Sequence, residues 1–228
     1  TTAILEDRLL SLGIELAEIE VVEPNQIVVR LPQAADVLAT EEILTSTGKL
    51  SLRNQKPKTE PELASRIESL QRLLVEQNTL TQTEEPAQAK ALQPEIDETR
   101  AAIASLFEPA ELTGARLESA TAKRALGDIW EVDIQFDEQG AERFAAQTQR
   151  MAGTGRAVGL FLDDVLLSAP VVDVKFAETG ITGGKAVISG NFTEAAAKEL
   201  EVQLNSGALP VSLKTVKITS TEEAATQD

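Results

Sequence analysis

Carboxylates are the side chains of this sequence best placed to do chemistry. Asp163 and Asp164 are adjacent, and Asp133 and Asp137 could lie near them in the fold. Such a group could bind a hard cation, or serve as a carboxylate pair for acid-base work. Adjacent residues of a strand point to opposite faces, however, and Asp in a turn mostly hydrogen-bonds its own backbone. We therefore favour a turn at these residues and expect no catalytic, cofactor-binding or metal-binding residue.

Missing residue types narrow the chemistry further. The chain has no Cys and no His, which excludes thiolate nucleophiles, Ser-His and Cys-His couples, and the zinc and haem sites built from those ligands. Residues 153–155 lack the third Gly of a dinucleotide loop, and Gly184-Lys185 lacks the hydroxyl that ends a phosphate-binding loop. A hydrolase using carboxylates such as Asp133 and Asp163 stays a remote alternative, because the sequence forces no pair together. The prediction is a protein that is not an enzyme and has no cofactor.

Charge and composition limit the partners. The 228 residues include 37 acidic and 21 basic side chains, for a formal net charge of −16, which repels phosphate backbones and anionic membranes. We therefore expect no nucleic-acid partner. No apolar run approaches the roughly 20 residues of a membrane span, and there is no initiator Met or signal peptide. We expect a soluble piece of a longer chain that meets a membrane only through spans it lacks.

The first quarter of the chain predicts a small α+β arrangement. Apolar spacing favours a helix over 2–12, strands on either side of Pro24-Asn25, a helix over 36–46 and a strand over 49–54. The order helix, strand, strand, helix, strand is that of a βαββαβ ferredoxin-like unit without its first strand. We expect an empty sheet edge, caused by a truncation upstream of the first residue.

Two helical series in the middle of the chain predict an antiparallel helical hairpin over 60–108. The first series is Leu63, Ile67, Leu70 and Leu74, and the second is Leu92, Ile96, Thr99, Ile103 and Leu106. Both alternate steps of four and three residues, so the helices should pair along this seam.

Residues beside the seam are candidates for function. Leu73, Leu80 and Phe107 fall off the seam, and we take them as candidate polypeptide-binding residues, although isolated exposed apolar side chains are common. Before the hairpin, Pro57 and Pro61 interrupt the apolar pattern, so this segment is a candidate hinge or linker.

The second half of the chain alternates strands and helices. We expect a strand over 128–136 and a helix that begins at Asp137. Further expected elements are strands on both sides of Asp163-Asp164, a strand after Gly183-Gly184, a helix capped by Thr193 or Asn191 and ended by Gly207, and a final strand over 210–219. Trp130 should pack in the core or at a domain interface, and the polar tail 221–228 should be disordered.

Ordered segments from Leu112 onward resemble the SecD family, membrane-anchored accessory subunits of the bacterial Sec protein-export machinery. The matching stretches are "LTGARLESA", "FDEQGAERFAAQT", "AVGLFLDDVLLSAPVV", "ITGGKAVISGNFT" and "EAAAKELEVQLNSGALPVSL", with looser matches at "RLLSLGI", "NQIVVRLP" and "TGKLSLR". The resemblance is to the first large extracytoplasmic domain of the family. The family's early aspartate-leucine-arginine-glycine-glycine strand, its membrane spans and their proton-carrying acidic residue are absent, and the hairpin is longer than expected there.

The resemblance implies two lobes. A ferredoxin-like base would comprise residues 1–55 and 191–220, and an inserted α+β head would comprise residues 56–190, including the helical hairpin 60–108. The head would swing relative to the base near Pro57.

The resemblance also implies a function in transport. The chain would capture unfolded secretory polypeptide and assist proton-gradient-driven export on the extracytoplasmic side, periplasmic or lumenal, of a bacterial inner or thylakoid membrane. Its partners would include SecF and the SecYEG channel. The alternative is a docking module that contacts the channel or SecF without binding cargo.

Overall fold

The chain folds into two compact units, which are described separately. The computed structural model describes residues 1–23, 25–32, 36–83, 85–125 and 127–219. Unit 1 is Thr1–Thr47 with Leu209–Asp228, and unit 2 is Gly48–Ala208. Pro24 of the predicted turn and the predicted disordered tail 221–228 lie outside the described residues. None of the helices in the described ranges has the length and apolar character needed to cross a membrane.

Unit 1 packs helices against a β-hairpin. Its described elements are α1 (Thr2–Ser11), β1 (Glu18–Glu23), β2 (Gln26–Arg30) and α2 (Val37–Thr45), close to the predicted positions. β1 and β2 pair antiparallel, with Ile19 opposite Val29. One side of this hairpin packs against a small apolar core, whose buried members are Leu5, Leu9, Leu44 and Leu209.

A buried arginine ties α1 to α2 in unit 1. Arg8 is fully buried, and its Nη1 donates to the main-chain oxygens of Ile43 and Ser46, each at 2.6 Å. These carbonyls lie at the C-terminal end of α2, where main-chain oxygens lack helical partners and the helix dipole is negative. The Arg8 guanidinium supplies hydrogen-bond donors to these oxygens and a positive charge beside the negative end of the helix dipole.

The predicted ferredoxin-like sheet does not form among the described residues. β1 and β2 make a two-stranded sheet, whereas β3 (Leu50–Asn54) pairs with strands of unit 2. β3 is buried on both faces, which requires neighbours that the small core of unit 1 does not supply. The final strand predicted over 210–219 is also not formed in the described residues.

Unit boundaries also differ from the predicted base and head. The prediction divided the chain at 55/56 and 190/191, and the structure divides it at 47/48 and 208/209. β3 stays with unit 2 because it pairs with β7 (Val158–Leu162), and α7 (Glu194–Asn205) stays there because it packs on β5 (Leu117–Arg124). Pairing with distant strands and helices, and not closeness in the sequence, therefore decides which unit β3 and α7 belong to.

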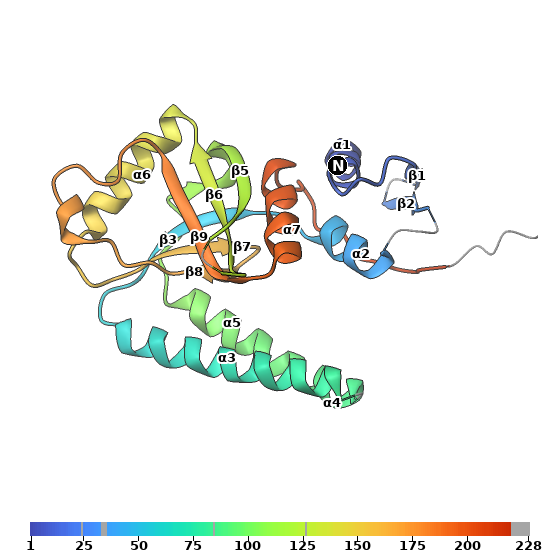
Figure 1. Cartoon of the computed structure of the whole chain (residues 1–228), viewed down its shortest axis with the longest axis horizontal. Helices are drawn as coiled ribbons and strands as arrows, with labels where there is room; N and C mark the ends of the chain where they lie inside the picture. The colour runs from blue at the N-terminus through green and yellow to red at the C-terminus, as the bar shows by residue number, and fades with distance from the viewer. Residues whose placement is uncertain (24, 33–35, 84, 126, 220–228) are drawn as a thin grey trace, which may run out of the picture. The chain divides into compact units, whose positions relative to one another are not determined.

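Unit 2 contains two antiparallel sheets in its described residues (Figure 1). Their strand orders are β4-β3-β7-β8 and β5-β6-β9. The remaining elements, besides β3, β5, β7 and α7, are α3 (Glu60–Gln82), α4 (Pro86–Ala91), α5 (Gln93–Ser105), β4 (Leu112–Thr113), the short 3₁₀ helices η1 (Gly114–Arg116) and η2 (Val174–Phe176), β6 (Trp130–Phe136), α6 (Glu138–Met151), β8 (Val165–Ser168) and β9 (Lys185–Phe192).

The main core of unit 2 joins both sheets to α6 and α7. Its buried members include Leu52 of β3, Val132 and Ile134 of β6, Phe144 of α6 and Leu200 of α7. Trp130 packs against this core, as predicted. The alternation of buried and half-buried residues from Val132 to Phe136 of β6 is the pattern of a strand with one face in a core.

Local signals at helix starts and at the tight turn are confirmed. The Asp137 carboxylate accepts a hydrogen bond from the Gly140 N–H at the start of α6, and the Thr193 hydroxyl accepts one from the Ala196 N–H at the start of α7. Asp163 and Asp164 connect β7 to β8 with positive φ angles of 49° and 68°. Two central residues with positive φ are the mark of a type I′ turn, which suits the twist of a two-residue hairpin.

Candidate functional site

The root of the helical hairpin is anchored in unit 2 by an apolar cluster. α3 packs along α4 and α5, and α5 contacts β8 (Figure 1). We call the buried residues at this end the root cluster: Leu63, Ile103, Leu106, Phe107, Ala157 and Phe161. The Phe107 and Phe161 rings meet edge to face with centroids 4.9 Å apart, a favourable aromatic geometry.

A charged side chain also contacts the Phe161 ring. The Arg53 guanidinium lies 4.5 Å from the ring centroid, its Nε donates to the Ser51 hydroxyl, and it pairs with Asp164 in the β7–β8 turn. The cation–π contact links β3 to β7, and the ion pair links β3 to the β7–β8 turn. The Phe161 ring at the root of the hairpin therefore has one aromatic and one cationic contact.

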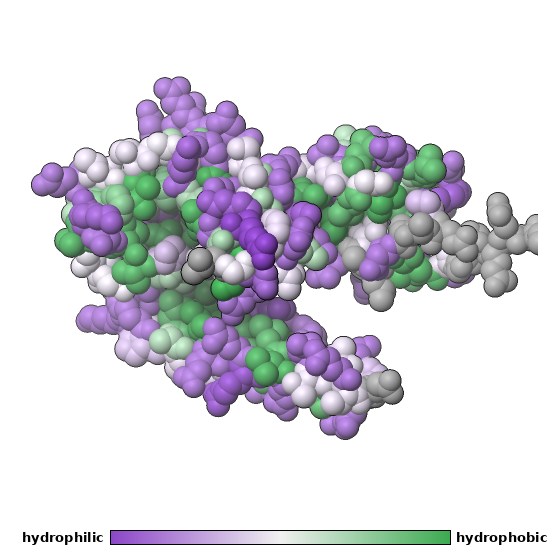
Figure 2. Space-filling model, in the orientation of Figure 1, coloured by the Kyte–Doolittle hydropathy of each residue, from purple (hydrophilic) through white to green (hydrophobic). Residues whose placement is uncertain are grey.

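The tip of the hairpin, residues 73–92, exposes apolar side chains instead. Val75 is 67% exposed and Leu74 is 37% exposed, whereas Leu73 and Leu80 are half-buried. Beyond Leu70, α3 contacts α4 and α5 but no longer the root cluster. At this level of the hairpin the half-buried side chain is Leu73, whereas the sequence predicted Leu74. In Figure 2 a green patch interrupts the mostly purple and white surface of the hairpin.

The structure corrects the sequence expectation for Phe107. Its side chain is only 4% exposed and belongs to the root cluster, because the chain turns back toward β3 there and Gln55 bridges to Phe107. A buried ring of this kind cannot meet a partner without unpacking the root. The sequence analysis did not single out Val75. Its exposure depends on how far along the hairpin the contacts with the sheets extend.

Pro57 and Pro61 lie inside unit 2, between β3 and the first turn of α3. The adjoining segment is fastened to its surroundings: the Gln55 N–H donates to the Ala157 oxygen at 2.9 Å, and the Lys56 N–H donates to the Leu106 oxygen at 2.9 Å. The predicted hinge between the two lobes was placed at these prolines. The chain instead passes between the units at 47/48 and 208/209.

The carboxylates considered at the outset have structural partners. Asp163 accepts hydrogen bonds from the Gly48 and Lys49 N–H groups at 3.0 and 2.8 Å, which fixes the start of β3 to the β7–β8 turn. Asp133 pairs with Lys123 at 2.7 Å. Across the described ranges no three His, Cys, Asp or Glu side chains gather closely enough to hold a metal ion. These groups organise the fold.

Electrostatic effects at Asp137 and at Lys123, the partner of Asp133, agree with such structural roles. The Gly140 N–H and then Arg116 stabilise the charged Asp137, which lowers the pKa of its carboxyl below the usual value. Hydrogen bonds to Asp133 and then Glu131 raise the pKa of the Lys123 ammonium. Both shifts favour the charged forms at neutral pH, so neither group is tuned for proton transfer there.

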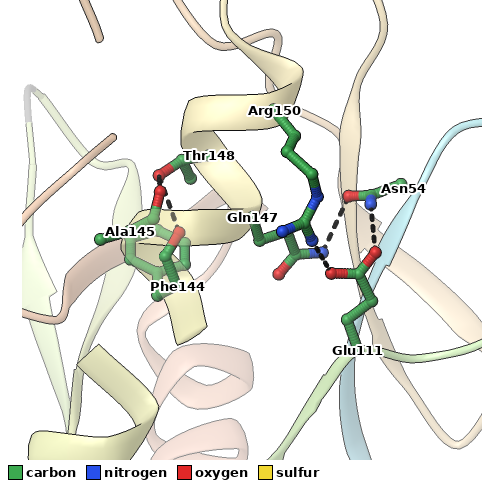
Figure 3. Close-up of polar contacts among 7 residues, drawn as sticks. All are labelled: Asn54, Glu111, Phe144, Ala145, Gln147, Thr148 and Arg150. Carbon is green, nitrogen blue, oxygen red and sulfur yellow. Dashed lines mark hydrogen bonds and ion pairs between the residues drawn. The ribbon is translucent and has the colours of Figure 1, made fainter. Parts of the chain in front are cut away.

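A polar network near α6 ties together three distant segments (Figure 3). The Asn54 amide donates to Glu111 Oε1 at 2.7 Å, and the buried Gln147 amide donates to Asn54 Oδ1 at 2.9 Å. Arg150 pairs with the other oxygen of Glu111. Glu111 and Arg150 match each other's charge and the amides orient one another, whereas the buried Gln147 Oε1 accepts no hydrogen bond from a described residue. The network ties the three segments of unit 2 together. Its members are too far apart in sequence to form a local motif.

Comparison with known proteins places the chain in a family of transport components. A family model described as "SecDF, P1 head subdomain" matches residues 84–211, more than half of the chain. The chain belongs to the SecD family. Protein translocase subunit SecD of Synechocystis sp. is 40% identical over 225 residues, covering 94% of this chain and 46% of that protein. The same subunit of Prochlorococcus marinus is 30% identical over 249 residues, covering 95% of this chain and 50% of that protein.

This SecD-family chain spans about half the length of the curated relatives it matches. A solved structure described as "Structure and function of a membrane component SecDF that enhances protein export" aligns with a TM-score of 0.66 at 24% identity. The alignment covers 96% of this chain and 90% of that one, which supports a shared α+β fold.

Proposed function

We propose that this chain is an extracytoplasmic part of a Sec translocase subunit and that it captures unfolded polypeptide during export. Unit 1 would act as the base and unit 2 as the head. The observation that carries the proposal is the helical hairpin, whose root is buried while its tip presents Leu74 and Val75 to solvent. Exposed apolar side chains on an anchored support give a surface for weak contacts with unfolded chains.

Net charge adds a preference to this surface. The chain carries a formal charge of −16, which keeps it soluble and attracts basic or neutral segments more than acidic ones. We expect binding that tolerates many sequences, weakens with salt for basic segments and involves no chemical change in the cargo. In the full protein, SecF and the SecYEG channel would be partners, and the membrane part would use the proton gradient at a bacterial inner or thylakoid membrane.

A docking role is the second candidate. The root cluster fixes the position of the hairpin within unit 2, and a fixed, projecting helix pair also suits a contact with the channel or SecF. In that case Leu74 and Val75 would face a folded partner instead of cargo.

The test shortens the hairpin without removing its root. Deleting residues 62–106 would take away Leu63 and Ile103 and expose Phe161, so the better variant replaces residues 73–92 with a Gly-Ser connection. Binding of a fluorescent unfolded secretory polypeptide is measured by anisotropy at two salt concentrations. Cargo capture predicts reduced binding by the shortened chain and by Leu74→Ser/Val75→Ser.

The contrary result separates the two candidates. Equal binding by the intact and shortened chains would remove the tip as the capture surface. If the shortened hairpin binds polypeptide normally but the full-length subunit carrying it no longer assembles with the channel or SecF, the docking role is correct.

A further inference from the structure

The two outer edges of the sheet β5-β6-β9 can be assigned group by group. In an antiparallel pair, alternate residues direct their N–H and C=O groups toward the partner strand and away from it. The Phe136 N–H donates to the Gly184 oxygen at 2.9 Å, and the register continues with Ile134 opposite Ala186. Ala186 and Ile188 therefore bond to β6. The main-chain groups that face the outer edge of β9 are those of Lys185, Val187 and Ser189.

The edge on β5 is covered by α7. The Ala120 N–H donates to Asn205 Oδ1 at 2.8 Å, and Asn205 Nδ2 donates to the Ala120 oxygen at 2.9 Å. Next along the strand, the Ala122 N–H donates to Glu201 Oε2 at 3.2 Å. Side chains of a helix thus make the hydrogen bonds that another strand would make, and this edge is blocked.

The edge on β9 has no such cover in the described part of unit 2. β9 is hydrogen-bonded to β6 alone, and no described side chain bonds to the outward groups of Lys185, Val187 or Ser189. β8 contacts β9 but belongs to the other sheet and does not pair with it. β8 has four residues and β9 has eight, so β8 is too short to lie along the whole of β9.

We infer that the outer edge of β9 binds an extended, proline-free segment of polypeptide as an added β-strand. The outward N–H and C=O groups are complementary to the main chain of any extended peptide, whatever its side chains. That tolerance fits the unfolded cargo of the proposed function, on which this inference rests. The net charge of −16 opposes pairing of the edge with a second copy of this chain.

Side chains along β9 add a modest preference. Val187 is 42% exposed, and Lys185 and Ser189 are exposed on the same face. An added strand would place its alternate side chains beside them. Segments with β-branched residues should therefore bind best beside Val187, and the net charge of −16 favours a positive charge on them. Glu131 and Asp133 on the same sheet face are already paired with Lys123.

A proline on the edge tests the pairing directly. In Val187→Pro the outward N–H is lost and a strand can no longer approach, but no hydrogen bond to β6 is removed. The control Val187→Thr keeps the main chain and the β-branched shape. The probe is a fluorescein-labelled alternating Val/Thr/Lys peptide, and its partner probe carries Pro at alternate positions.

We expect the unchanged chain and Val187→Thr to bind the first probe and Val187→Pro to bind it roughly tenfold more weakly. The Pro-containing probe should bind no better than background. Equal binding of the first probe by Val187→Pro and Val187→Thr would overturn the inference while leaving the proposed function in place.

Disulfide trapping gives a second measurement if Val187→Pro does not fold. The chain has no Cys, so Ser189→Cys introduces a single thiol on β9, and Val75→Cys introduces one at the hairpin tip. A probe with one Cys should be trapped at position 189 in a register-dependent way. If the probe is trapped at position 75 only, the β9 inference is overturned and the proposed function stands. If neither the unchanged chain nor any variant binds the probe, the proposed function is overturned as well. A dimer through β9 without peptide binding would also overturn the inference.

Discussion

The root and the tip of the helical hairpin are built from the same two stretches of sequence but have opposite surroundings. At the root, Phe107 is buried in a cluster with Leu63 of α3, Ile103 of α5 and Phe161 of β7. At the tip, Val75 and Leu74 are exposed. The comparison indicates that stability resides at one end of the hairpin and an available surface at the other, so mutations at the two ends should separate folding from binding.

Removing the Phe107 ring should have the largest effect. We expect Phe107→Ala to lower the free energy of unfolding of unit 2 by about 3–5 kcal/mol, because a buried aromatic ring is lost and a cavity remains. Urea unfolding followed by the fluorescence of Trp130, the one tryptophan of the chain, reports on unit 2. Leu80→Ala at the tip is the matched control and should have a much smaller effect. Equal effects would remove the distinction between root and tip.

Crowding the root should come next. A Cβ at Gly159 of β7 would lie 2.5 Å from the Phe107 ring and 2.6 Å from the Phe161 ring. Gly159→Ala should therefore destabilise unit 2 by roughly 1–3 kcal/mol through overpacking. The double variant Gly159→Ala/Phe107→Leu removes one of these two close contacts, so its loss of stability should be less than the sum of the single losses. Strict additivity would contradict the contact.

The charged cover of the root should contribute less. We expect Arg53→Gln to lower the free energy of unfolding by about 1 kcal/mol, because the cation–π contact with Phe161 is lost. Asp164→Asn removes only the ion pair, whose carboxylate is exposed, and should have a smaller, salt-sensitive effect. The free energy of unfolding of both variants is measured by urea unfolding at low and high salt. A larger loss for Asp164→Asn than for Arg53→Gln would show that the contact of Arg53 with the Phe161 ring is unimportant.

Changing the tip should alter stability least and binding most. For Leu74→Ser/Val75→Ser we expect a change of less than about 0.5 kcal/mol in the free energy of unfolding, since exposed positions away from the root are tolerant. Binding of unfolded polypeptide, measured by anisotropy on the same samples, should fall clearly. A variant that loses stability but keeps binding would reverse the roles assigned to the two ends.

Local elements could be predicted because their signals are local. Apolar spacing indicated α1, α2 and α5, and single side chains marked the starts of α6 at Asp137 and α7 at Thr193. The same applies to the β7–β8 turn at Asp163–Asp164. β5, with the sequence LESATAKR, was not predicted, because small and polar residues carry no strand period and its pairing with β6 supplies the order.

The site was less predictable than the elements. Leu73 and Leu80 were singled out from the helical spacing, yet the same reasoning included Phe107, which is buried, and omitted Val75, which is exposed. The network of Asn54, Glu111 and Gln147 could not be foreseen, because its partners are up to 93 residues apart.

The sequence by itself determined the absence of thiol and imidazole chemistry, the negative charge, most helices and strands, and the resemblance to the SecD family. These properties depend on residue types and on short-range periodicity. The tertiary structure decided that β3 and α7 join unit 2 and that Phe107 is enclosed. It also decided that α7 covers the β5 edge, whereas no described strand or side chain bonds to the outer edge of β9. Each of these outcomes depends on which distant surfaces meet, because burial and edge pairing are properties of contacts between elements.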